Sequence, residues 1–164
     1  SCSVRLPLHA GLLDDVFREA ISHVDRKASE HEISIELADD FLMAKMDVRL
    51  IVQVIINIVN NAIKYTPEGS HICLSARKEK KMVLIRIADD GPGISDEAKL
   101  HLFDMFYTAD IGKADSRRGL GLGLSLCKSI VDAHGGKISV SNNKPHGAVF
   151  TFTLPLEEVN FDHV

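Results

Sequence analysis

Four short segments of this chain carry side chains and glycines whose types and spacing suit a nucleotide triphosphate. In chain order they are Asn57–Tyr65, Asp89–Ile94, Phe103–Tyr107 and Gly119–Leu124. The first offers amide oxygens and an ammonium group, the second a carboxylate beside a glycine turn, and the fourth backbone N–H groups at the start of a helix. Each segment alone is weak evidence, but the set and its order predict a pocket for a nucleotide triphosphate and its Mg²⁺.

Asn57, Asn61 and Lys64 fall at positions i, i+4 and i+7, so a helix places them on one stripe. Asparagine is a poor helix former, and a buried amide without a partner costs on the order of 1–3 kcal/mol. Because Mg²⁺ prefers hard oxygen ligands, we expect Asn61 to bind the metal and Asn57 to lie near the metal and the γ-phosphate. Lys64 and Tyr65 would reach phosphate oxygens. The alternative is that both amides hydrogen-bond to neighbouring backbone.

Asp89 follows an expected strand and precedes Gly91 and Gly93. Glycine permits positive φ and lets a backbone approach a ligand closely. An ionised aspartate accepts hydrogen bonds only, so it suits an exocyclic amino group such as that of adenine. A simple turn between a strand and a loop is the alternative interpretation.

The fourth segment alternates glycine with leucine and leads into a helix; its residues are Gly119, Leu120, Gly121, Leu122, Gly123 and Leu124. Unhindered N–H groups at a helix start form an anion site. The segment lacks the ending of a Walker P-loop, and no acidic residue about twenty positions on marks a dinucleotide fold. A tightly packed junction between a loop and a helix remains the alternative.

Between the two glycine segments, Phe103, Phe106 and Tyr107 precede a polar stretch that ends at Arg117 and Arg118. Long irregular segments in compact domains are usually lids or disordered. We expect the aromatic residues to anchor a lid that gains order with nucleotide, and one arginine to meet the γ-phosphate. The alternative is an ordinary aromatic packing contact followed by a solvated charged run.

Composition excludes several classes of protein. The 164 residues fit one domain, 45% are hydrophobic and 26% charged, and a net charge of −4 gives no basic footprint for nucleic acid. The three cysteines lack metal-ligand spacing and indicate a reducing compartment. No run reaches the roughly 18 apolar residues of a membrane span. The start at Ser1 suggests an excised fragment, which could belong to a membrane-tethered protein.

Hydrophobic periodicity and turn residues predict the order of elements. Helices are expected at about Leu12–Ser29, from an N-cap at Asp47 to Lys64, at Glu97–Phe103, and from the glycine run to His134. Strands are expected at Ser3–Leu6, Ile33–Leu37, Ile72–Arg77, Val83–Ala88, Ile138–Ser141 and Val149–Leu154. These elements predict a two-layer α/β sandwich in which three helices cover one face of a mixed sheet. The domain would span 1–156, and 157–164 would form a tail.

The order and spacing of the four segments resemble the N, G1, F and G2 boxes of the catalytic ATP-binding domain of bacterial sensor histidine kinases. These domains belong to the GHKL superfamily and have the Bergerat ATP fold. The resemblance covers about Val4 to Leu156 and includes Lys64-Tyr65-Thr66-Pro67 and His134-Gly135-Gly136. Leu120 stands where many histidine kinases have Thr or Ser, and Asp90 stands where Asn is frequent. Within the family the chain is similar to KdpD-type potassium-responsive kinases.

The resemblance implies roles for individual residues. Asn61 would be the Mg²⁺ ligand, and Asp89 would accept from adenine. The implied nucleotide-binding set is Asn57, Asn61, Lys64, Tyr65, Asp89, Gly91, Gly93, Ile94, Phe103, Phe106, Gly119, Leu120, Gly121, Leu122, Gly123 and Leu124. The implied catalytic set is Asn57, Lys64, Arg117 and Arg118.

Position 57 separates the branches of this superfamily. ATP-hydrolysing relatives usually carry a glutamate there, which can activate water, whereas the amide of Asn57 cannot take a proton. No His-Glu/Asp-x-Arg-Thr-Pro segment occurs, so we expect the phosphoaccepting histidine on a dimerisation domain upstream of Ser1. A GHKL-type ATPase and a nucleotide-binding module without catalysis are the alternatives.

The resemblance also implies the surroundings of the domain. We expect a monomeric, cytoplasmic domain that belongs to a dimeric sensor of the inner membrane. Its partners would be its own dimerisation domain and a response regulator, and its cofactors ATP and Mg²⁺.

Overall fold

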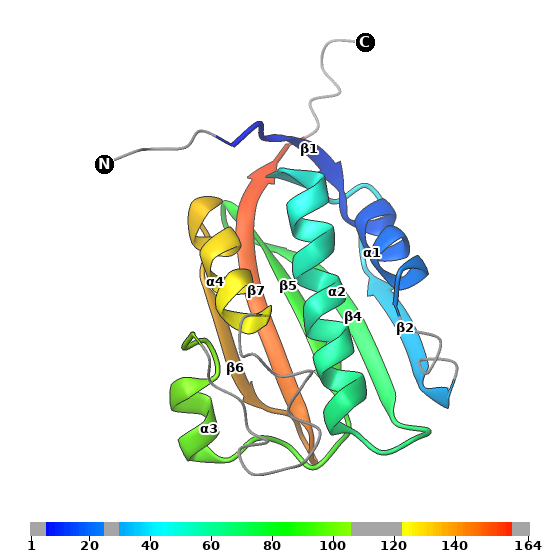
Figure 1. Ribbon diagram of the computed structural model, residues 1–164. Helices are drawn as coiled ribbons and strands as arrows, with labels where there is room; N and C mark the ends of the chain where they lie inside the picture. Colours follow the sequence, from blue (N-terminus) through cyan, green and yellow to red (C-terminus); the bar gives the residue numbers. More distant parts are fainter. Residues whose placement is uncertain (1–5, 25–29, 106–122, 159–164) are drawn as a thin grey trace.

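The computed structural model describes residues 6–24, 30–105 and 123–158, which form two layers (Figure 1). Within this part of the chain the helices are α1 (Leu13–Ser22), α2 (Val48–Tyr65), α3 (Asp96–His101) and α4 (Gly123–Ala133). The strands are β1 (His9–Leu12), β2 (Glu32–Leu37), β3 (Met43–Met46), β4 (His71–Glu79), β5 (Met82–Asp89), β6 (Ile138–Asn142) and β7 (Ala148–Glu157). The predicted two-layer α/β sandwich is confirmed.

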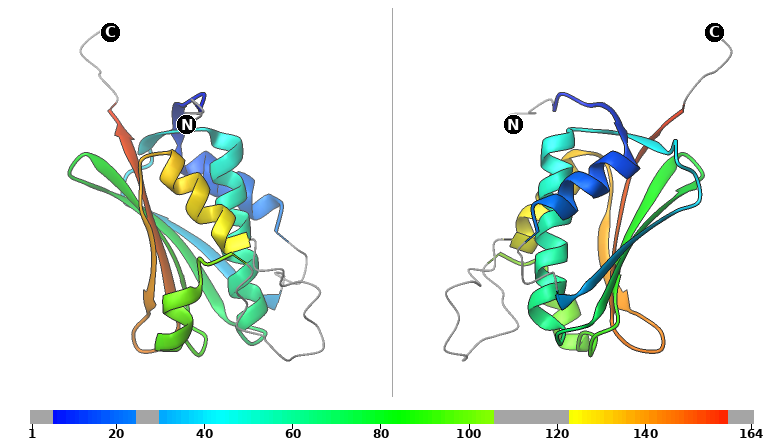
Figure 2. Two further views of the ribbon diagram at one scale, coloured as in Figure 1. Left: turned by 60° about the vertical axis from the view of Figure 1, so that its left-hand side comes forward. Right: turned by 90° about the vertical axis from the view of Figure 1, so that its right-hand side faces the viewer.

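The strands form one mixed sheet in the order β1-β3-β7-β5-β4-β2, and β6 also pairs with β7. Only β2 and β4 run parallel; the other described pairs are antiparallel. Figure 2 shows α1, α2 and α4 on one face of this twisted sheet, while none of the described helices lies on the opposite face. The three long helices therefore cover one face, as the sequence predicts.

Helix α2 crosses the middle of the sheet and is held by a cap and a buried stripe. The carboxylate of Asp47, the N-cap, accepts a hydrogen bond from the backbone N–H of Leu50 at 3.4 Å. The helix ends where Thr66 turns to an extended backbone before Pro67, which disfavours helical geometry in the residue that precedes it. Its fully buried residues include Ile51, Val54, Ile55, Ile58 and Val59. This packing fixes the rotation of α2 about its axis, and with it the directions in which Asn57 and Asn61 point.

His134 joins the end of α4 to the start of α2. Its Nδ1–H donates to the carbonyl of Ile130 at 2.7 Å, and its Nε2 accepts from the backbone N–H of Asp47 at 3.0 Å. The ring is 3% exposed. Because Nε2 accepts, the imidazole is neutral with its proton on Nδ1.

Replacing His134 with leucine should therefore destabilise the fold by about 1–3 kcal/mol, since the buried N–H of Asp47 loses its partner. Chemical unfolding monitored by circular dichroism measures this loss. The matched control is His101→Leu, at an exposed helix end. Equal midpoints for His134→Leu and the unsubstituted chain would contradict a structural role for the bridge.

Two short strands differ from the sequence prediction. The first strand lies at His9–Leu12 rather than Ser3–Leu6, of which residues 3–5 lie outside the described part of the chain. It pairs with β3, a strand that the sequence analysis missed. Each has only four residues, too few for a clear alternating pattern, so their mutual pairing defines them.

The other boundaries differ by a few residues. Helix α1 ends at Ser22, where the N–H of His23 donates to the carbonyl of Ala20. The sequence predicts that this helix extends to Ser29, but residues 25–29 lie outside the described part of the chain. Strand β7 continues to Glu157, which pairs with Met43, so the sheet extends one residue past the predicted domain end. No described helix is long and apolar enough to span a membrane.

Candidate functional site

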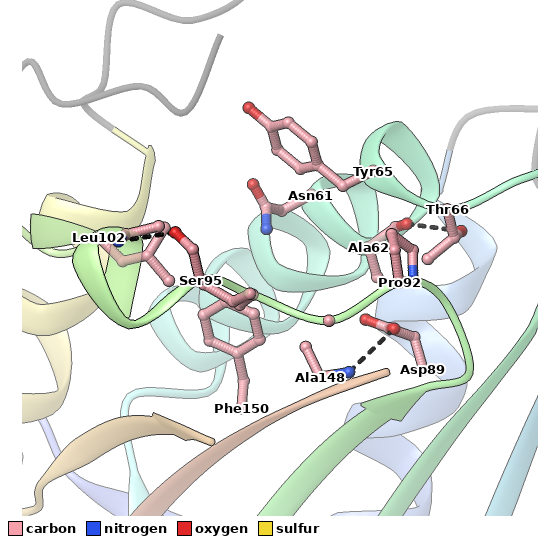
Figure 3. A pocket seen from close by; sticks show the side chains of 13 residues that line it. Asn61, Ala62, Tyr65, Thr66, Asp89, Pro92, Ser95, Leu102, Ala148 and Phe150 are labelled. Carbon is pink, nitrogen blue, oxygen red and sulfur yellow. Dashed lines mark hydrogen bonds between the residues drawn. The ribbon is translucent and has the colours of Figure 1, made fainter. Parts of the chain in front are cut away.

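A pocket of about 180 Å³ lies between the C-terminal half of α2 and the ends of β5 and β7 (Figure 3). Its lining residues are Asn61, Ala62, Tyr65, Thr66, Asp89, Pro92, Gly93, Ile94, Ser95, Ala98, Leu102, Ala148 and Phe150. Five of them belong to the predicted site: Asn61, Tyr65, Asp89, Gly93 and Ile94. The structure thus brings the first two sequence segments together at one cavity.

The alternation of β5 directs Asp89 into the pocket. Val83, Ile85 and Ile87 are buried on the helix-covered face, and Asp89 continues the same period of two. On the neighbouring strand, Ala148 and Phe150 occupy the corresponding face of β7. A carboxylate therefore stands at the end of an otherwise apolar row.

One oxygen of Asp89 is occupied and the other is available. Its Oδ1 accepts from the backbone N–H of Gly91 at 3.0 Å and from that of Ala148 at 3.1 Å. Among the described residues none donates to Oδ2, although Asp89 is only 7% exposed. The two N–H groups fix the orientation of the carboxylate. The free oxygen is a preorganised acceptor for a donor on a ligand.

The loop after Asp89 is shaped for close approach. A Cβ on Gly91 would lie 2.5 Å from the methyl carbon of Thr66, so a larger residue would push the loop away from α2. Gly93 has a φ of +86°, a conformation that favours glycine. Gly91 itself does not line the pocket; it holds Asp89 through its N–H.

The side chains of Asn61 and Tyr65 rise from α2 at the mouth of the pocket (Figure 3). Among the described residues none bonds to the Asn61 amide, so its oxygen is available to a ligand. The ammonium group of Lys64 lies 5.1 Å from the centre of the Tyr65 ring, a cation–π contact. Lys64 is exposed and does not line the cavity.

Asn57 does not line the pocket either. It is half-buried and hydrogen-bonds with Cys127 of α4. Burial raises the pKa of the Cys127 thiol to about 12, although the hydrogen bond with Asn57 acts in the opposite direction. The Cys127 sulfur also lies 3.7 Å from the carbonyl of Val54. A neutral thiol thus holds Asn57 against α4, one turn of α2 away from Asn61.

The remaining predicted residues are placed in part. The ring of Phe103 packs edge-on against Phe150, with centroids 6.2 Å apart, and so supports the pocket wall from behind. Gly123 is exposed at the start of α4, and Leu124 packs against the core. Phe106, Arg117, Arg118, Gly119, Leu120, Gly121 and Leu122 lie outside the described residues, as does most of the expected lid. Their roles remain predictions.

Several pocket residues were not predicted from the sequence. Thr66 donates to the carbonyl of Ala62 at 2.7 Å and bonds to the ring of His31 at 2.9 Å, which ties the end of α2 to the residue before β2. Ala148 contributes only its backbone N–H, and such a contribution cannot be recognised from the residue type. Ala98 and Leu102 contribute apolar surface that a sequence pattern attributes to ordinary core packing.

The side chains at this site fit a magnesium ion whose other ligands are phosphates and water. Within the described residues no group of three or more His, Cys, Asp or Glu side chains could hold a metal. Asn61 offers one hard oxygen beside a pocket, and Mg²⁺ is commonly held by few protein ligands together with phosphates and water. The site fits a metal–nucleotide complex better than a free metal ion.

Comparisons with known proteins agree on one family. Residues 46–158 match the family described as histidine kinase-, DNA gyrase B-, and HSP90-like ATPase. The sensor protein KdpD of Clostridium acetobutylicum is 44% identical over 146 residues, which cover 89% of this chain and 16% of KdpD. The chain therefore spans only a small part of that relative's length.

Solved structures give the same result. The nucleotide-free catalytic domain of the histidine kinase ThkA has a TM-score of 0.80 at 32% identity, and the match covers 92% of this chain and 96% of that domain. Full-length ShkA in complex with AMPPNP has a TM-score of 0.82 at 25% identity, covering 97% of this chain and 33% of ShkA.

Proposed function

The chain belongs to the family of histidine kinase-, DNA gyrase B- and HSP90-like ATPases, and we propose that it transfers the γ-phosphate of ATP to a histidine on a separate dimerisation domain. Within the family it is an ATP-binding catalytic domain of the sensor histidine kinase type. The observation that carries the proposal is the Asp89 carboxylate. Two backbone N–H groups hold one oxygen, and the other faces a pocket that Asn61 also lines.

Asp89 binds the base. Its free Oδ2 accepts a hydrogen bond from the 6-amino group of adenine, and a carboxylate rejects a 6-oxo group because both would be acceptors. Ile94, Leu102 and Phe150 supply the apolar surface against which the ring packs. This arrangement selects adenine over guanine.

Asn61 holds Mg²⁺ together with the phosphates. The ion, when bound, neutralises charge on the phosphates as the γ-phosphoryl group leaves. Lys64 and Tyr65 lie one turn further along α2 and orient phosphate oxygens. The proposal extends to the phosphate end of the site. There Arg117 or Arg118 would meet the γ-phosphate, and the glycines from Gly119 to Gly123 would line the phosphates.

Asn57 favours transfer over hydrolysis. Its amide is not a general base, and its position against the neutral thiol of Cys127 provides no proton acceptor for an attacking water. Phosphoryl transfer requires mainly positioning and charge stabilisation, so the nucleophile can come from another domain. A GHKL-type ATPase, the second candidate, would need a base that this position lacks.

The whole protein would be a dimeric sensor of the inner membrane in which this domain is cytoplasmic and monomeric. Its similarity to KdpD supports the KdpD-type assignment and this context. The response regulator is the proposed downstream partner, because the histidine kinase ThkA has been solved in complex with the response regulator TrrA.

We expect this domain alone to bind Mg²⁺–ATP but to hydrolyse it slowly, because position 57 carries an amide. With γ-labelled ATP and a supplied dimerisation domain, label should move to the histidine of that domain. The control is the same dimerisation domain with its histidine changed to glutamine. Steady-state hydrolysis at the rate of a dedicated GHKL ATPase, without a partner, would reject the kinase assignment.

A further inference from the structure

Residues 142–147, which comprise the last residue of β6 and the turn that leads to β7, contact the loop that carries Asp89. This segment is called the 142–147 turn. These two segments are about fifty residues apart in the sequence, yet three side chains of the turn hydrogen-bond to the backbone of the loop. Asn143 Nδ2 donates to the carbonyl of Asp89 at 2.9 Å. Asn142 Oδ1 accepts from the N–H of Ile94 at 3.1 Å, and His146 Nδ1 donates to the carbonyl of Gly91 at 3.1 Å.

The contacts are spaced so that they hold the whole loop. They reach its first residue, its glycine turn and its last residue, and the backbone N–H of Ala148 adds a bond to the Asp89 carboxylate itself. Gly147 has a φ of +112°, and a Cβ there would overlap the carbonyl of Asp89. The turn therefore lies in direct backbone contact with the loop, and the hydrogen bond from Asn143 N–H to the carbonyl of Gly147 closes it at 2.8 Å.

We propose that Asn143 and His146 are positioning residues that aim the free oxygen of Asp89 at the base and thereby set the preference for adenine. The inference rests on the proposed function, since it assumes that Asp89 binds the 6-amino group. Neither side chain lines the pocket. They act through the backbone of the loop: Asn143 fixes the Asp89 carbonyl, and His146 fixes the carbonyl of Gly91, the residue whose N–H holds Oδ1.

A hydrogen bond is sensitive to direction, and its strength falls steeply as donor and acceptor lose alignment. Apolar packing of the ring is less sensitive, because it has no preferred direction. Loss of the turn contacts should consequently reduce recognition of the 6-amino group more than general affinity for the purine triphosphate. A purely structural turn would have the opposite signature, with lower stability and unchanged selectivity.

The test compares ATP with purine riboside triphosphate, which carries the same phosphates but has hydrogen in place of the 6-amino group. Calorimetric titration gives the ratio of the two dissociation constants, in which triphosphate and metal effects cancel. In the unsubstituted chain we expect ATP to bind at least about tenfold more tightly, as for one hydrogen bond to a charged group.

Asn143→Ala and His146→Leu each remove one donor and should lower this ratio to roughly threefold or less. His146→Asn returns an N–H near the place of Nδ1 and should restore the ratio. The control is Lys144→Ala, on the same turn, whose side chain is exposed; it should match the unsubstituted chain.

Two results would overturn the inference, and they can be told apart. If both donor variants keep the parental ratio while their thermal midpoints fall, the turn stabilises the fold without positioning Asp89. If the unsubstituted chain binds both nucleotides equally, the adenine assignment of the proposed function fails, and the role of the turn fails with it. Should one variant not fold, the His146→Leu and His146→Asn pair, or Asn143→Ala alone, still decides the question.

Discussion

Asn61→Ala should remove Mg²⁺-dependent phosphotransfer to a supplied dimerisation domain, by about 100-fold or more. The metal lowers the activation free energy by several kcal/mol because it stabilises the charge that develops on the phosphates, and each 1.4 kcal/mol changes the rate about tenfold. The apo fold should survive, because the Asn61 side chain bonds to none of the other described residues and alanine is the strongest helix former. Transfer rates measured over a series of Mg²⁺ concentrations give the effect.

A binding measurement separates loss of the metal from loss of the active geometry. In the unsubstituted chain ATP affinity should rise with Mg²⁺, and in Asn61→Ala this dependence should largely disappear. Gln53→Ala is the matched control, since Gln53 is an exposed amide on the same helix, two turns before Asn61. A variant as active as its parent at every Mg²⁺ concentration would assign Asn61 a structural role instead.

Asp89→Asn should weaken ATP binding by roughly 10- to 100-fold, on the order of 1–3 kcal/mol for a buried polar mismatch. The geometry makes this substitution unusually informative. The amide oxygen can keep both bonds that Oδ1 accepts from Gly91 and Ala148, while an NH₂ group replaces Oδ2 and meets the amino group of adenine donor to donor. GTP, whose 6-oxo group is an acceptor, should lose less affinity or gain some.

The control for this variant lies next to it in the chain. Asp90→Asn makes the same chemical change at an exposed residue, whose Oδ1 accepts from the N–H of His71 at 2.8 Å and can continue to do so. Titrations with ATP and GTP, together with thermal unfolding, should show altered selectivity only at position 89. Unchanged ATP affinity in Asp89→Asn would place the adenine site elsewhere.

Much of the fold follows from patterns that short stretches of sequence already contain. The apolar stripe of α2, its cap at Asp47 and its end before Pro67 predict that helix within a residue or two. The alternation along β5 predicts which face carries Asp89. These features are local: a residue's side follows from the helical or extended period, and a cap acts on an N–H three residues away. For the same reason Asn61, Tyr65, Asp89, Gly93 and Ile94 could be assigned to one pocket by their types and order.

Contacts between distant segments were decided by packing and register, which no local pattern encodes. Strands β1 and β3 are defined by their pairing with each other. Asn57 lies on the same stripe of α2 as Asn61, but it contacts Cys127 instead of the pocket because α4 packs beside it. The pairing of β5 with β7 places the 142–147 turn on the Asp89 loop. Residue chemistry alone therefore predicts that Asp89 accepts a hydrogen bond. The tertiary structure determines which of its two carboxylate oxygens is free, because one of the N–H groups that occupy Oδ1 comes from Ala148, on a strand 59 residues further along the chain.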